Sequence, residues 1–157
     1  MSVSLPAWYH GGFPDAERLM SSLFSPLIGG VDVVPWFPKP SEYVPHLENG
    51  GAYLRAARTG GSFNFDENRD EPRVQIAALS KSRAQSWEII EFVRQTIWSF
   101  KRGALVPGTQ TQLQTQSEVL GPQLIPENIV EPRLVPATFA LHTWKPGLTT
   151  YRQALGL

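Results

Sequence analysis

The segment SRAQSWEIIEFVRQTIWSF, residues 82–100, is the longest periodic stretch of the chain, and it contains neither glycine nor proline. Ser82 is a suitable N-cap, Lys101 and Arg102 favour a helix C-terminus, and Gly103 ends the pattern. Its apolar residues cluster on one side at 100° per residue. They are Ile89, Ile90, Phe92, Val93, Ile97 and Phe100. The segment therefore predicts one long amphipathic helix that covers a core.

Outside this helix, 14 prolines and 13 glycines divide the chain into short elements. Asp15 and the following apolar spacing predict a helix over residues 15–25. The remaining segments are interpreted in order along the chain. Residues 31–37 predict an edge strand or a strand with a break at Pro35, and residues 38–50 a turn-rich connection. Residues 51–58 suit a strand or a helix, and a strand is favoured because glycines bound this short segment on both sides. Further along, residues 59–61 predict a turn, 64–72 an acidic loop, 73–80 a strand, and 134–144 a final strand.

The order helix, strands, helix, strands predicts an α+β fold with a mostly antiparallel sheet and two helices packed on one face. At 157 residues the chain is expected to form a single domain, residues 1–157. Two extensions are expected: an N-terminal aromatic arm over residues 1–13, and an extended hairpin or arm over residues 104–133, with an irregular proline-containing segment up to residue 136.

Composition excludes several classes of function. The absence of cysteine excludes disulfides, cysteine zinc sites and thiol nucleophiles. Fourteen basic and fourteen acidic residues give a net charge of zero, which argues against general phosphate attraction and against binding to an anionic membrane. No run of 18 apolar residues is present, and the first residues do not resemble a signal peptide. We expect the chain to work in the cytosol or in something assembled there.

The search for catalytic chemistry yields only weak candidates. His10, His46 and His142 lack helical metal-ligand spacing, and no phosphate loop or nucleophile elbow is present. Four acids lie close together, but without the ligand pattern of a calcium loop, so they are interpreted as solvated. They are Asp66, Glu67, Asp70 and Glu71. No catalytic, cofactor-binding or metal-binding residue is predicted.

A second face of the long helix favours an interaction. Trp87 and Trp98 fall on one edge of the helix, because eleven residues nearly complete three turns. Glu91 and Arg94 share that edge, which lies away from the apolar stripe. Tryptophan and arginine are enriched in interface hot spots, so these four residues are the candidate subunit interface. The alternative is that the core extends far enough to bury both tryptophans.

The segment TQTQLQTQ, residues 109–116, is too polar to fill a core. It is suited to strand addition onto the sheet of a neighbour. An ordinary edge strand or a loop explains the same composition equally well.

The order of these segments resembles the tail terminator, or tail completion, proteins of long-tailed bacteriophages, especially those of phages of actinobacteria. The resemblance is carried by YLRAARTGG (53–61), RVQIAALSKSRAQSWEIIEFVRQTI (73–97) and LVPATFALHTW (134–144). In that family a strand ending in an Arg-x-Gly-Gly turn precedes a polar loop, and a further strand leads into the long helix. The likeness covers about residues 13–145, and the aromatic arm and residues 121–136 depart from it.

The resemblance implies a structural virion protein without catalytic activity, made in the host cytoplasm and located at the head–tail junction. It implies a homo-oligomeric ring, usually a hexamer, that caps the tail tube, ends its polymerisation and meets the head–tail connector. Its partners would be further copies of itself, the tail tube protein and connector proteins, with DNA passing through the lumen without sequence-specific binding. Arg55, Arg58 and Arg69 are candidates to face that lumen; the alternative is that they pair with the nearby acids.

Three alternatives stay open at this point. A head–tail connector or neck protein would show a similar pattern. A small hydrolase or metal-dependent enzyme would use His142 or His46 with Asp66. A peptide-binding adaptor would use the sheet edge over residues 109–120.

Overall fold

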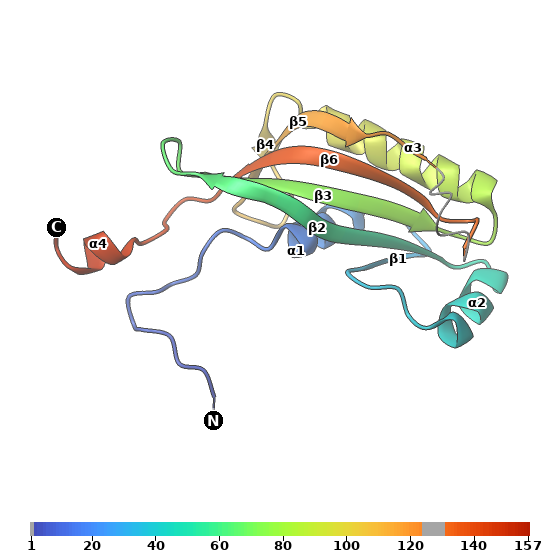
Figure 1. Cartoon of the computed structure of the whole chain (residues 1–157), viewed down its shortest axis with the longest axis horizontal. Coiled ribbons are helices and arrows are strands. Elements are labelled where there is room, and N and C mark those ends of the chain that lie inside the picture. The colour runs from blue at the N-terminus through green and yellow to red at the C-terminus, as the bar shows by residue number, and fades with distance from the viewer. Residues whose placement is uncertain (1, 124–130) are drawn as a thin grey trace.

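The computed structural model describes residues 2–123 and 131–157 (Figure 1). Six strands form one sheet in the order β1-β2-β3-β6-β5-β4, in which β1 and β2 are parallel and all other neighbours antiparallel. The elements are α1 (Ala16–Phe24), β1 (Val31–Val34), α2 (Pro40–Glu48), β2 (Ala52–Asn64), β3 (Arg69–Leu79), α3 (Arg83–Ser99), β4 (Ala104–Leu105), β5 (Gln112–Leu120), β6 (Val135–Trp144) and α4 (Tyr151–Ala154). The predicted α+β class is confirmed, with four described helices instead of two.

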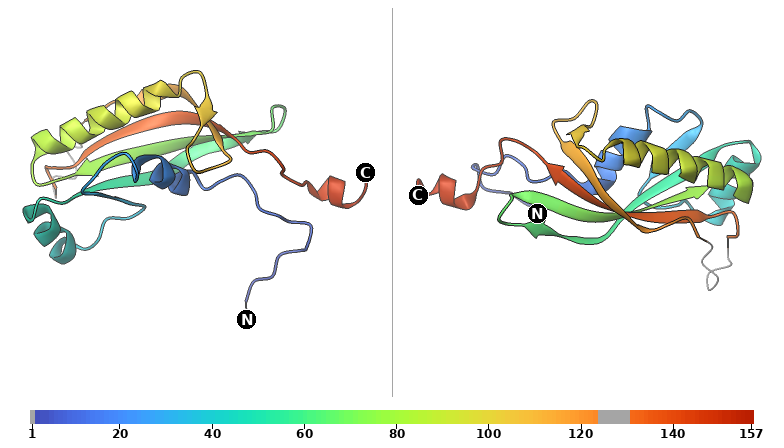
Figure 2. Two further views of the ribbon diagram at one scale, coloured as in Figure 1. Left: turned by 180° about the vertical axis from the view of Figure 1, so that it is seen from behind. Right: turned by 90° about the horizontal axis from the view of Figure 1, so that it is seen from above.

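Helices α1 and α3 cover the same face of the sheet (Figure 2). Asp15 caps α1 by accepting a hydrogen bond from the backbone N–H of Glu17 (2.9 Å), as its position predicts. The apolar side of α1 is fully buried. Its residues Leu19, Met20, Leu23 and Phe24 meet side chains of β2, β3, β6 and α3 in the main core.

The long helix begins and ends close to its predicted bounds. Ser82 accepts a hydrogen bond from the backbone N–H of Gln85 and caps α3, which ends at Ser99. Its buried stripe consists of Ser86, Ile90, Val93 and Ile97. The assignment of Phe92 to the core side was wrong: its side chain is 41% exposed, because it lies at the outer rim of the stripe.

Strand β1 is an edge strand, as predicted, but it ends at Val34 before Pro35 and does not reach residue 37. The turn-rich connection predicted for residues 38–50 is wrong, because Pro40–Glu48 forms α2. Proline is tolerated at the start of a helix, where its missing N–H would have no partner. The helix is held by Tyr43 and Leu47, which are four residues apart and pack on Tyr53 and Leu79 across the sheet from the main core.

Strands β2 and β3 form a long hairpin that the sequence interpretation divided incorrectly. The turn predicted at residues 59–61 is a bulge inside β2, and residues 69–72 of the predicted acidic loop belong to β3. The chain reverses at residues 65–68 instead, where Asn68 adopts a positive φ of 50°. At Gly61 (φ +100°) a Cβ atom would lie 2.8 Å from Cα of Pro72. Glycine is needed here because β2 and β3 approach each other closely, and not because the chain reverses.

The last strand, β6, lies between β3 and β5, and it confirms the strand predicted over residues 134–144. β4 and β5 form the edge beyond it. Residues 124–130, part of the expected arm over 104–133, lie outside the described residues.

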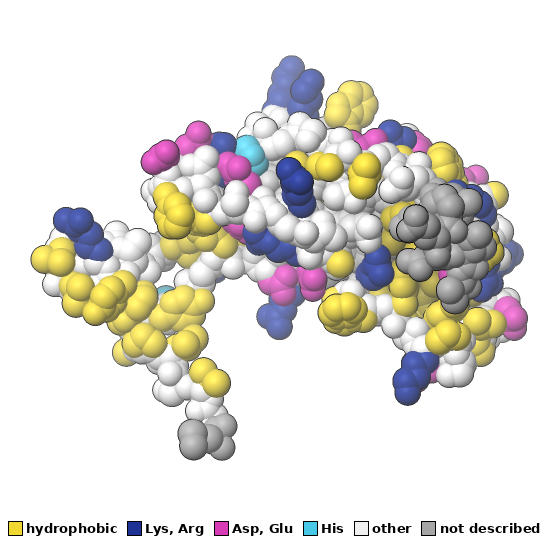
Figure 3. Space-filling model, viewed as in Figure 1, with side chains coloured by type: hydrophobic (Ala, Val, Ile, Leu, Met, Phe, Trp, Pro, Cys, Tyr) yellow, Lys and Arg dark blue, Asp and Glu magenta, His cyan; other side chains and the backbone are white. Residues whose placement is uncertain are grey.

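The sheet face opposite α1 and α3 is covered by α2 at one end only, and much of what Figure 3 shows of it is polar. The two terminal segments leave the molecule at one end of the sheet (Figure 1). Residues 2–13 contain no helix or strand, and residues 145–157 lead into the short helix α4.

Candidate interaction surface

The four residues proposed as an interface share one flank of α3. Trp87, Glu91, Arg94 and Trp98 are spaced by four, three and four residues, which places them in one row beside the buried stripe. Trp87 is 40% and Trp98 70% exposed. The alternative that the core buries both tryptophans is therefore wrong. Their contact with another subunit stays a prediction.

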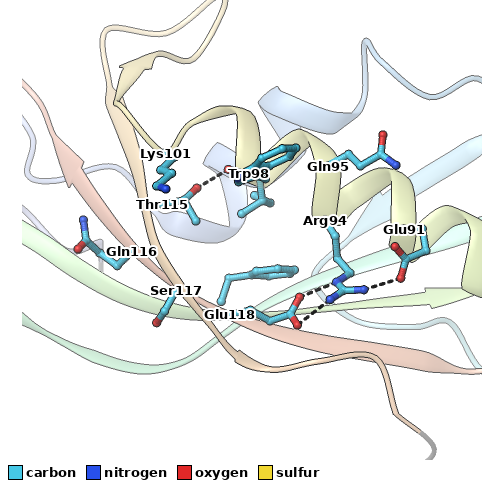
Figure 4. A pocket seen from close by; sticks show the side chains of 11 residues that line it. Glu91, Arg94, Gln95, Trp98, Lys101, Thr115, Gln116, Ser117 and Glu118 are labelled. Atoms are coloured by element: carbon cyan, nitrogen blue, oxygen red, sulfur yellow. Dashed lines mark hydrogen bonds and ion pairs between the residues drawn. The ribbon is translucent and has the colours of Figure 1, made fainter.

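Arg94 connects this flank to strand β5 (Figure 4). Its Nε and Nη2 donate to the two carboxylate oxygens of Glu118, at 2.6 and 3.0 Å, and its Nη1 donates to Glu91 Oε1 at 2.6 Å. The hydrogen bonds with Glu118, and then with Glu91, raise the pKa of the Arg94 guanidinium. These side chains are about one-third exposed, so we expect the network to orient the flank more than to stabilise the fold.

The two tryptophans have different surroundings. The Arg83 guanidinium lies 5.9 Å from the ring centre of Trp87. Arg83 also donates to the carbonyl oxygens of Pro132 (3.1 Å) and Leu134 (3.4 Å). The guanidinium beside Trp87 is therefore fixed to the segment before β6 of the same chain. Trp98 instead projects into a groove between α3 and β5 (Figure 4). Trp98 is therefore the more available of the two.

The groove has a volume of about 510 Å³. From α3 and the turn after it come Glu91, Arg94, Gln95, Ile97, Trp98 and Lys101; from β5 and β6 come Thr115, Gln116, Ser117, Glu118 and Phe139. At one end two carboxylates share the single Arg94, and Lys101 lies at the other end (Figure 4). The groove thus combines an exposed aromatic ring with two carboxylates that share one arginine at one end, while Lys101 at the other end brings the formal charge of its lining to zero.

The outer edge of β5 forms one side of this groove. β4 pairs only with Gln112 and Leu113. Thr115 bonds instead to the end of α3, donating its N–H to the Phe100 carbonyl (3.1 Å) and its hydroxyl to that of Ile97. The rest of the strand, residues 116–120, is exposed and contains two bulges. Bulges twist an edge away from further pairing, so the geometry favours an ordinary edge over strand addition.

Sequence reasoning missed Glu118, Lys101 and Thr115. The first lies 24 residues from its partner Arg94, and the two elements meet only because β6 places β5 beside α3. No local spacing signals that contact.

Arg58, one of the three arginines predicted to face a lumen, is bound to a buried acid. Its Nη1 and Nη2 donate to the two oxygens of Asp70, at 2.6 and 2.9 Å. The Asp70 side chain is only 8% exposed. The hydrogen bond to Asp70 raises the pKa of Arg58. Register places both residues on the helix-covered side of the hairpin, level with Val74 and its core neighbours.

Arg55 and Arg69 alternate onto the opposite, uncovered face. Arg55 donates to Gln75 and lies 5.1 Å from the ring centre of Phe37, and burial lowers its pKa. Arg69 bonds to Glu67 and to Glu71 (2.8 Å). The three arginines therefore do not form one patch, and two of them pair with the nearby acids, as the alternative had it.

The two histidines of the hydrolase alternative, His46 and His142, pair with carboxylates other than Asp66. His46 lies 3.5 Å from Asp32, and His142 lies 3.6 Å from Glu71. Burial lowers the pKa of His142. Within residues 2–123 and 131–157, no group of three or more acids and histidines is arranged to hold a metal ion. The helices of this same part of the chain are too short or too polar to cross a bilayer.

Comparison with known proteins gives one match. A family model described as "Phage tail termination protein" matches residues 12–150. This range contains the whole sheet, helices α1, α2 and α3, and the groove. No curated protein matches the chain.

Proposed function

Because the chain belongs to the family of phage tail termination proteins, we propose that it forms a homo-oligomeric ring that caps the finished tail tube. The ring stops further polymerisation of the tube and presents its other side to the head connector. The match over residues 12–150 is the observation that carries this proposal. Six-fold symmetry is the arrangement that the family resemblance favours.

The surface of the subunit supports assembly with further copies. Trp98 is 70% exposed beside Arg94, and such residues dominate the binding energy of protein interfaces. Further large apolar side chains are exposed on the terminal segments, among them Leu5, Tyr151 and Leu157. Burial of these apolar groups against neighbouring subunits removes them from water, and the hydrophobic free energy of that burial favours assembly.

The proposed partners are the tail tube protein on one side of the ring and head–tail connector proteins on the other. DNA would pass through the lumen without sequence-specific contacts, which suits a chain of zero net charge. Arg55 and Arg69 on the uncovered sheet face are the better candidates for the lumen wall. Arg58, turned to the other face, is a weaker one.

The test uses a phage whose copy of this gene is disrupted. We expect tails longer than normal that fail to join heads, and normal tails when the intact chain is supplied. Electron microscopy of particles carrying a labelled chain should show label in one ring at the head-proximal end of the tail. Normal tail length without the chain would refute the proposal, and label above the tail, within the connector, would establish the neck alternative.

A further inference from the structure

The two terminal segments, residues 2–13 and 145–157, form an apolar extension outside the body of the molecule (Figures 1 and 3). Trp8 and Tyr151 join them, with ring centres 5.7 Å apart. Val3 is 92% and Leu157 76% exposed, and Leu5 and Leu155 are more than half exposed. The extension thus holds together but leaves most of its apolar surface in water, which is typical of a segment that binds another protein.

The charge of this extension differs from that of the body. Lys145 and Arg152 are the only residues of the extension with a charged side chain at neutral pH, counting histidine as neutral. All 14 acidic residues of the sequence lie between Asp15 and Glu131. The extension is therefore cationic as well as apolar. A binding site for it needs an exposed hydrophobic surface next to carboxylates that outnumber their local basic partners.

The groove between α3 and β5 meets both requirements. Trp98 supplies the hydrophobic surface, and at the Arg94 end Glu91 and Glu118 supply two carboxylates against one arginine, with Lys101 at the far end of the groove. The extension of the same chain does not fill it: Trp98 stays 70% exposed, and α4 lies apart from α3 in all three ribbon views (Figures 1 and 2).

We propose that the terminal extension of one subunit docks in the α3–β5 groove of the neighbouring subunit. Tyr151 and Leu155 would pack against Trp98, and Arg152 would approach Glu91 and Glu118. The inference rests on the proposed ring and names the surfaces that build it. Extension and groove are different surfaces, so the contact runs head to tail, and such a contact forms a ring instead of an isolated pair when the rotation between neighbours closes.

The natural absence of cysteine allows a direct test with the full chain. One preparation carries Ala154→Cys on α4, and a second carries Ser117→Cys in the groove; both positions are exposed. The two are mixed at high concentration and treated with a short bismaleimide. A third preparation with Ser41→Cys, exposed on α2, replaces the groove variant as the matched control.

We expect a cross-linked heterodimer from the Ala154→Cys and Ser117→Cys pair and at least about fivefold less from the Ser41→Cys control. Adding Trp98→Ala to the groove partner, or Arg152→Glu to the extension partner, should reduce the yield about tenfold with unchanged circular dichroism. Equal yields with groove and control, or no cross-link, overturn the inference. The tail-length test is independent, so a ring that forms without this contact would leave the proposed function standing.

Discussion

Asp70 is a buried carboxylate that depends on one partner, Arg58. Replacing Asp70 by Asn keeps the shape but removes the charge that the guanidinium faces. We expect the free energy of unfolding to fall by about 2 kcal/mol, since a buried pair that loses one member leaves the other without compensation. Urea denaturation followed by circular dichroism measures this loss.

The matched control is Asp66→Asn in the turn at the tip of the same hairpin, where the side chain is exposed. It should change the unfolding free energy by less than about 0.5 kcal/mol. If both variants unfold alike, the Arg58–Asp70 pair does not support the hairpin.

His142 gives the fold a dependence on pH with a defined sign. Burial, and then the charge of Arg69, lower its pKa below the ordinary value of 6.5, while Glu71 and Glu67 oppose the shift. The unfolded chain therefore takes up this proton first as the pH falls. The stability that neutral His142 contributes is complete above pH 6.5 and is lost progressively as the pH falls below that value. We expect His142→Gln to flatten the decline in stability that begins as the pH falls below 6.5.

Thermal or urea unfolding at several pH values measures the effect. His10→Gln, at an exposed position of the N-terminal segment, is the control and should leave the pH profile of the parent unchanged. A parent whose stability does not decline in this range, or a His142→Gln variant with the same decline, contradicts the role assigned to burial.

Single-residue predictions from sequence succeeded where the geometry is local. Helical spacing alone identified Trp87, Glu91, Arg94 and Trp98 as one flank of α3. The grouping of Arg55 with Arg58 overlooked a signal that the sequence contains: residues three apart on a strand point to opposite faces. The partner Glu118 had no such signal, because its position depends on how β5 pairs with β6.

Among the elements, the β2–β3 hairpin depends on a glycine at its bulge. A side chain at Gly61 would overlap the backbone of Glu71 and Pro72, at a φ of +100° that side chains disfavour. We expect Gly61→Ala to lower the unfolding free energy by about 3 kcal/mol. Chemical denaturation measures the loss.

Gly29→Ala is the matched control, since nothing lies within 4 Å of the added methyl group. This substitution should leave the unfolding free energy nearly unchanged. Equal stability of the two variants would show that the strands can separate at the bulge without cost.

Elements with strong local signals were predicted well, and those defined by distant contacts were not. Caps and apolar spacing located α1 and α3, and alternation located β6. Helix α2 was missed because its prolines suggested a connection, whereas Tyr43 and Leu47 hold it through contacts with β2 and β3. The start of β3 was taken for a loop because its residues are charged, whereas Asp70 pairs with Arg58 across the hairpin and Arg69 pairs with Glu71 along the strand.

For the whole molecule, assembly should depend unequally on the two tryptophans. Trp98→Ala is expected to weaken self-association about tenfold or more, because the ring is exposed in the groove. Trp87→Ala should have a smaller effect, since Arg83 already covers that ring. Sedimentation and light scattering over a range of concentrations measure the difference, and circular dichroism checks that both variants fold.

If Trp87→Ala weakened self-association more than Trp98→Ala, the interface would lie nearer the start of α3 than proposed. An unchanged oligomer in the double variant would remove this flank of the helix from the assembly surface.

The position of β6 in the sheet has a consequence for synthesis. The last strand to be translated lies between β3 and β5, so β4 and β5 have no place in the sheet until residues 135–144 have left the ribosome. Until then the edge of β3 is open, and the groove beside α3 lacks one of its walls. A nascent or truncated chain that lacks residues 135–144 therefore cannot present the surface on which its neighbours would assemble.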